Sequence, residues 1–153
     1  MKKKLIMLLT MAIAFVSCEG PEGPPGRDGI GVNKFVEVVT VEAHQWEYVD
    51  DPEGGYYICE KRFPEISGDI YLKGEIKCYY IIRPGQSNEA QTPLPYVLHF
   101  IDGSDYRWTE TIEYDFMPNT STADGSIAFY VQYDDFAINV PPGRMQFRVV
   151  ITW

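Results

Sequence analysis

The chain has 153 residues, 45% of them hydrophobic and 23% charged, which fits one folded domain with short appendages and excludes a disordered protein. Its formal net charge of −9 at pH 7 repels phosphate backbones and argues against nucleic acid as a partner. A cation or a basic protein surface remains compatible with this charge.

The first segment in chain order has the organisation of an export signal. Three lysines at positions 2–4 precede an apolar run over residues 5–16, which is shorter than the roughly 20 residues of a spanning helix. The run ends in Phe-Val-Ser-Cys, which resembles the bacterial lipoprotein signal, in which a small residue precedes a lipidated cysteine. This resemblance implies a signal peptide over residues 1–17 and a lipid on Cys18. The alternative is a plain secretory signal with an incidental cysteine.

A lipid on Cys18 would hold the protein at a membrane, because several acyl chains on one residue bind a bilayer almost permanently. Glu19 and Glu22 follow the cysteine and resemble the surface-export signals of Bacteroidetes-type lipoproteins. We therefore expect a cell-envelope protein at the outer membrane, either periplasmic or surface-exposed.

Glycine recurs at every third position after the cysteine, as in the Gly-X-Y repeat of collagen, with prolines between: Gly20, Gly23, Gly26 and Gly29. So short a repeat favours an extended single-chain tether, at about 3.1 Å per residue, over a triple helix. We predict a tether over residues 18–33, with a trimerising collagen stub as the alternative.

From residue 34 to residue 153 the sequence changes to short alternating runs separated by turn residues. We expect strands at residues 35–41, 56–63, 75–82, 96–101, 106–116, 127–133 and 144–152, one helical turn within residues 66–72, and polar loops over residues 83–93 and 117–125. Seven to eight short strands without long helical periodicity predict an all-β fold, an antiparallel β-sandwich of jelly-roll or immunoglobulin-like type.

The whole arrangement resembles small Bacteroidetes-type lipoproteins that place a collagen-like Gly-Pro stalk before a C-terminal β-sandwich domain. That family has no established activity, so the resemblance implies no residue roles.

Two cysteines lie within the predicted domain, Cys59 and Cys78, each among apolar neighbours of an expected strand. Export to an oxidising compartment would allow a disulfide between them, if strand pairing brings them close. Two buried free thiols are the alternative, because cysteine is among the most buried residue types.

No catalytic motif is evident, and we expect neither an enzyme nor a cofactor. His44 and Glu47 would fall on opposite faces of an extended segment, and His99 has the apolar surroundings of a structural histidine. Asp102 and Asp105, in an acidic turn, are weak candidates for binding calcium, although aspartate is also common in turns for conformational reasons.

Aromatic residues near strand ends are the remaining candidates for ligand contact. We select Trp108 first, with Tyr106 and Trp46, because flat rings stack on sugars and anchor protein interfaces, although core packing would explain many such residues. The sequence thus favours a non-enzymatic interaction module that binds another protein. A carbohydrate-binding module, assisted by calcium, is the alternative.

Overall fold

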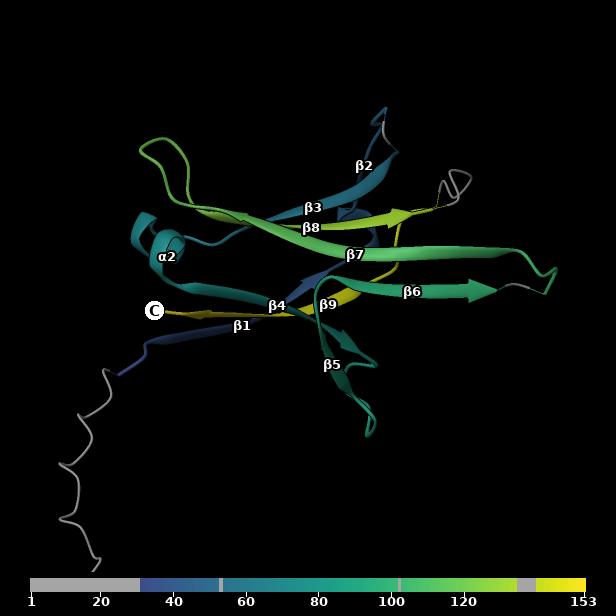
Figure 1. Ribbon diagram of the computed structural model, residues 1–153, viewed down its shortest axis with the longest axis horizontal. Helices are drawn as coiled ribbons and strands as arrows, with labels where there is room; N and C mark the ends of the chain where they lie inside the picture. The colour runs from purple at the N-terminus through teal and green to yellow at the C-terminus, as the bar shows by residue number, and fades with distance from the viewer. Residues whose placement is uncertain (1–30, 53, 102, 135–139) are drawn as a thin grey trace, which may run out of the picture. The chain divides into compact units, whose positions relative to one another are not determined.

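A computed structural model describes residues 31–52, 54–101, 103–134 and 140–153 (Figure 1). Residues Val32–Trp153 form one compact unit. The predicted signal peptide, Cys18, most of the predicted tether and Asp102 lie outside the described residues.

Within these residues the chain forms nine strands and two short helices: β1 (Lys34–Val41), η1 (Ala43–Gln45), β2 (Glu47–Val49), β3 (Tyr56–Arg62), α2 (Gly68–Lys73), β4 (Glu75–Ile82), β5 (Ala90–Pro93), β6 (Tyr96–Ile101), β7 (Arg107–Met117), β8 (Ser126–Tyr133) and β9 (Met145–Thr152). The structure has more strands than the seven to eight expected, because it includes two very short strands that were not predicted. These are β2, of three residues, and β5, of four. Residues 90–93, which we expected to be loop, form β5 by pairing with the end of β4.

The strands form two antiparallel sheets, and the predicted β-sandwich is confirmed. One sheet has the order β1-β9-β4-β5 and the other has the order β2-β3-β8-β7-β6. Figure 1 shows the second sheet lying over the first. Strand β6 is therefore an edge strand, with β7 on one side of it.

The core lies between the central strands β8 and β9. Phe129 of β8 and Phe147 of β9 are stacked, with ring centroids 4.1 Å apart and an angle of 11° between the rings. The predicted inward face of the last strand is confirmed, since its alternate residues Met145, Phe147, Val149 and Ile151 are all buried. Tyr114 of β7 adds a polar link between the sheets, because its hydroxyl donates to the Ile76 carbonyl of β4 at 3.0 Å.

The predicted helical turn is the short helix α2. The Ser67 hydroxyl accepts a hydrogen bond from the Ile70 amide, which caps the first turn, and Ile70 is buried in the core. Within the described part of the chain, no helix is both long and apolar enough to cross a membrane.

The disulfide that we considered between Cys59 and Cys78 is not formed. Cys59 lies on β3 and Cys78 on β4, in different sheets, so no strand pairing joins them. Both are buried free thiols, as in the alternative reading. Burial raises the pKa of the Cys78 thiol to about 12 and also raises the pKa of Cys59.

Candidate interaction surface

The β6–β7 hairpin continues past the rest of its sheet. Strand β7 pairs with β8 only from Glu110 to Met117, whereas its pairing with β6 begins at Arg107. Figure 1 shows this hairpin reaching further along the long axis than any strand of the other sheet. The base of this extension is fixed to the end of β8, because the Asp134 amide donates to the Thr109 carbonyl at 3.1 Å.

Three aromatic rings are stacked along one face of this extension. Phe100 lies directly opposite Trp108, with ring centroids 5.2 Å apart and an interplanar angle of 13°. Tyr106 stacks on Trp108 at 6.2 Å and 26°. Phe100 is 37% exposed and Tyr106 is 47% exposed, while Trp108 is half-buried between them. The structure thus brings two of the predicted contact residues together and adds a third, Phe100. We call these three residues the aromatic stack.

Trp46 does not belong to this surface, and its prediction as a contact residue is wrong. Its side chain is only 6% exposed, lies in the core, and donates from Nε1 to the Gly143 carbonyl at 3.2 Å. The cause is local: the one-turn helix η1, closed by a capping box between Glu42 and Gln45, immediately precedes Trp46. Trp46 is instead a core-packing residue, which was the alternative to ligand contact for these aromatic residues.

Strand β6 presents an apolar edge. Val97 and Ile101 point away from the core side and are 47% and 57% exposed. His99 lies between them and is exposed, not enclosed as we expected, and its Nδ1 lies 3.2 Å from the Thr109 hydroxyl. The strand itself contains no proline and no lysine, arginine, aspartate or glutamate, and Pro95 lies just before it. Protein sheets usually protect such edges with lysine, proline or a bulge.

A cleft of about 350 Å³ lies under the hairpin, where the two sheets separate. Its walls come from both sheets: Tyr80 and Ile82 of β4, Tyr96, Leu98 and Phe100 of β6, Glu110 of β7, and Gly143, Arg144 and Met145 at the start of β9. Glu110 is its acidic group. Burial raises the pKa of this carboxyl group, against the lowering effect of a hydrogen bond from the Tyr133 hydroxyl.

Our sequence reasoning missed Glu110, although a signal for it was present. In an alternating strand it shares a face with Trp108 and with Ile112, which is fully buried. An acidic residue between two large apolar residues on the inward face of a strand is uncommon. It deserved selection as a candidate.

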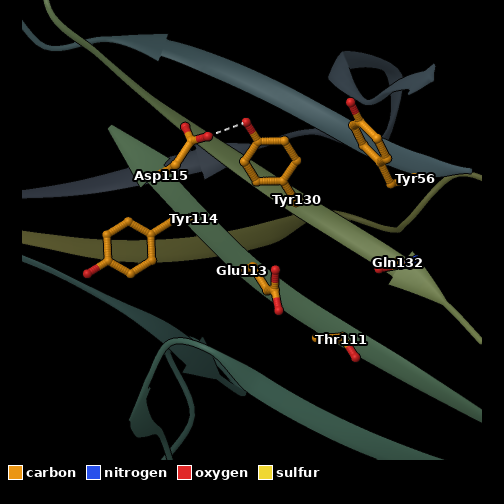
Figure 2. Close-up of a pocket in the computed structure, with 7 residues that line it drawn as sticks. All are labelled: Tyr56, Thr111, Glu113, Tyr114, Asp115, Tyr130 and Gln132. Carbon is orange, nitrogen blue, oxygen red and sulfur yellow. Dashed lines mark hydrogen bonds between the residues drawn. The ribbon is translucent and has the colours of Figure 1, made fainter. Parts of the chain in front are cut away.

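A second hollow, of about 400 Å³, lies on the outer face of the second sheet (Figure 2). Tyr130 donates to Asp115 at 2.6 Å, and burial together with this carboxylate raises the pKa of Tyr130. Figure 2 shows Tyr114 turned away from Tyr130 and Asp115. Glu113 and Asp115 come from the same strand and the same face, so they do not oppose each other across a cleft as glycosidase carboxylates do.

The acidic turn provides little support for a metal site. Asp105 is exposed and has a φ of 63°, a left-handed conformation that aspartate tolerates in turns. Among the described residues, no group of three or more histidines, cysteines or acidic residues is placed to hold a metal ion.

Comparison with protein-family models, with curated proteins and with solved structures found no match to this chain. The geometry of the hairpin, the cleft and the outer hollow is therefore the basis for inferring a function.

Proposed function

We propose that this protein is a non-enzymatic envelope lipoprotein, anchored through a lipid on Cys18, whose β-sandwich binds another envelope or extracellular protein through the β6–β7 hairpin. The observation that carries the proposal is the combination, on one hairpin, of an apolar edge strand and an exposed aromatic stack. An edge strand can accept an extended segment of a partner as a further strand, and aromatic side chains are the commonest anchors of protein interfaces.

The arrangement of the rings favours a protein over a sugar as the ligand at this hairpin. A sugar stacks on an open ring face, whereas the half-buried Trp108 ring is stacked with two neighbouring rings, Phe100 and Tyr106. The more exposed rings of the stack are Phe100 and Tyr106, one on each side of the hairpin turn. These fit a partner that surrounds the hairpin.

A lipid anchor would serve this function by concentrating the sandwich at the membrane, where a weak contact acts as an intramolecular one. The net charge of −9 would favour a partner with a basic surface. Replacing Cys18 with serine should release the protein from the membrane fraction of its own cells. Continued sedimentation with membranes would contradict the lipid anchor, whatever the hairpin binds.

Site-specific photo-crosslinking tests the hairpin directly. A photoreactive residue is placed at Val97 or Ile101 of the full-length lipoprotein in its own cells, and at Leu72 of α2, an apolar control position that is more exposed than either. We expect one crosslinked product from the two β6 positions, absent from the Leu72 position and lost on Trp108→Ala. The same products from all three positions, or none from β6, would contradict the proposed interface.

Carbohydrate binding, with calcium assistance, is the second candidate, and the outer hollow is the feature that favours it. The ring centroids of Tyr56 and Tyr130 lie 5.6 Å apart in this hollow. The side chains of Glu113, Asp115 and Gln132 also line it, and this mixture of rings and hydrogen-bond acceptors suits a sugar. A glycan panel with and without calcium tests this candidate. Binding that is lost on Tyr130→Ala and kept on Trp108→Ala would support it over the protein-binding hairpin.

A further inference from the structure

The cleft under the hairpin combines aromatic walls with one carboxylate. Tyr80 and Tyr96 face each other from different sheets, with ring centroids 6.1 Å apart and an interplanar angle of 31°, and Phe100 also lines the space. Leu98, Ile82 and Met145 supply aliphatic surface beside them. Tyrosine and phenylalanine rings attract cations that lie over their faces within about 6 Å of the ring centre.

The carboxylate of Glu110 lacks a cationic partner within the described residues. Its hydrogen bond comes from the Tyr133 hydroxyl, whereas an ionised carboxylate has two oxygens with about four acceptor positions. Arg144 also lines the cleft, but its Nε donates to Glu42 at 3.0 Å. Partial burial of an unpaired carboxylate costs free energy, and a bound cation would remove that cost.

We infer that this cleft binds an alkylammonium group, with Glu110 as the anion, Tyr80, Tyr96 and Phe100 as the aromatic walls, and the aliphatic side chains around the carbon chain. The ammonium would donate charge-assisted hydrogen bonds to Glu110. A volume of about 350 Å³ is at the lower end of ligand pockets, which suits a small amine or one lysine side chain. The inference concerns the cleft alone and does not depend on the protein partner proposed above.

Methionine methyl NMR on the detergent-solubilised full chain tests the site, because the chain carries an internal probe and an internal control. Met145 lines the cleft, whereas Met117 lies at the opposite end of β7. With ¹³C-methyl methionine labelling, n-butylammonium should shift the Met145 signal in a saturable way and leave Met117 in place. The uncharged analogue n-butanol should not shift Met145 at the same concentration. Equal shifts with n-butanol, or no shift with the ammonium, would overturn the inference.

Matched variants identify the anion. Glu110→Gln keeps an acceptor for the Tyr133 hydroxyl but removes the charge, and it should weaken n-butylammonium binding roughly tenfold or more. Glu113→Gln removes the same charge from the same strand, but on the outer face, and should leave binding unchanged. An unchanged affinity in Glu110→Gln with the Met117 signal intact would overturn the role of Glu110.

The pH dependence gives a readout that needs no variant. Binding should be lost as the pH falls through the raised pKa of Glu110, because the protonated acid no longer attracts the cation. Tyr80 and Tyr133 also face Glu110, and both stay neutral over this range because their pKa values are raised. Tyr96 and Arg144 line the same cleft. Binding that persists at acid pH would overturn the inference.

Two probes distinguish the sources of the ammonium, and binding of either supports the shared chemistry. Capped lysine that binds at least as tightly as n-butylammonium indicates a lysine side chain of a partner. Binding of n-butylammonium alone indicates a free amine.

Discussion

Truncation of two of the three tryptophans should weaken the protein in different ways, globally at Trp46, which lies in the core, and locally at Trp108, which lies on the hairpin extension. Trp46→Ala removes a large buried side chain and its hydrogen bond to the Gly143 carbonyl, and should lower the free energy of unfolding by about 3–5 kcal/mol. Many domains have only about 5–15 kcal/mol in total. This variant should therefore unfold at much lower urea concentration.

Trp108→Ala removes two ring contacts, those with Phe100 and Tyr106, each worth about 0.5–1.5 kcal/mol. Because only β6 pairs with β7 at this position, the loss of about 1–3 kcal/mol should fall on local opening of the hairpin. Amide exchange in peptides covering the hairpin should become roughly 5- to 150-fold faster. The global free energy of unfolding should change by less than about 1 kcal/mol.

Hydrogen exchange read by mass spectrometry measures local opening of the hairpin. Urea denaturation followed by far-ultraviolet circular dichroism measures the global free energy of unfolding. Trp108→Phe is the matched control, because it keeps a ring for the stack and should restore most of the protection. The reasoning would be refuted if Trp108→Ala lowered global stability as much as Trp46→Ala, or if hairpin exchange did not change.

Three further predictions concern the polar and thiol groups. Tyr114→Phe removes the donor to the Ile76 carbonyl and should lower the free energy of unfolding by about 1 kcal/mol in urea denaturation, and no change would mean that water replaces the hydroxyl. Cys59 and Cys78 should both resist iodoacetamide in the folded chain and react after unfolding, since burial raises both thiol pKa values, whereas a disulfide in a non-reducing peptide map would contradict free thiols. The pKa of Glu110 is higher in the folded than in the unfolded chain, so its ionisation disfavours folding once the pH exceeds the unfolded-state value. Glu110→Gln should therefore raise the melting temperature at pH 7, and the difference should disappear well below the ordinary pKa of 4.5; an unchanged melting temperature at pH 7 would argue against this burial.

Strand periodicity was sufficient to predict the sandwich. The residues Met145, Phe147, Val149 and Ile151 alternate with residues that are polar except for Val150, and a sheet buried on one face leaves few other arrangements for such a pattern. The short strand β5 was missed because its four residues, Ala-Gln-Thr-Pro, include no large apolar side chain and end in proline, so that the strand is evident only from its pairing with β4.

The candidate site was less predictable, because it depends on contacts between segments far apart in the chain. Sequence gave reason to select Trp108 and Tyr106, but nothing local indicated that Phe100 would lie opposite Trp108 in register. Trp46 lies between Gln45 and Glu47, polar neighbours that are typical of an exposed residue. The turn of η1 just before it directs its ring into the core. The separation of Cys59 and Cys78 likewise depends on strand order, which one sequence does not specify.

The pairing of the first and last strands has a mechanical consequence. β1 and β9 pair over eight residue positions, from Lys34 with Thr152 to Val41 with Met145, and Asn33 and Trp153 exchange both backbone hydrogen bonds beyond them. β1 begins at the end of the sandwich opposite the β6–β7 turn (Figure 1). Tension between an N-terminal anchor and a partner held at the hairpin would therefore act along β1, perpendicular to these hydrogen bonds. In this shear geometry the bonds share the force and must break together, instead of opening one at a time.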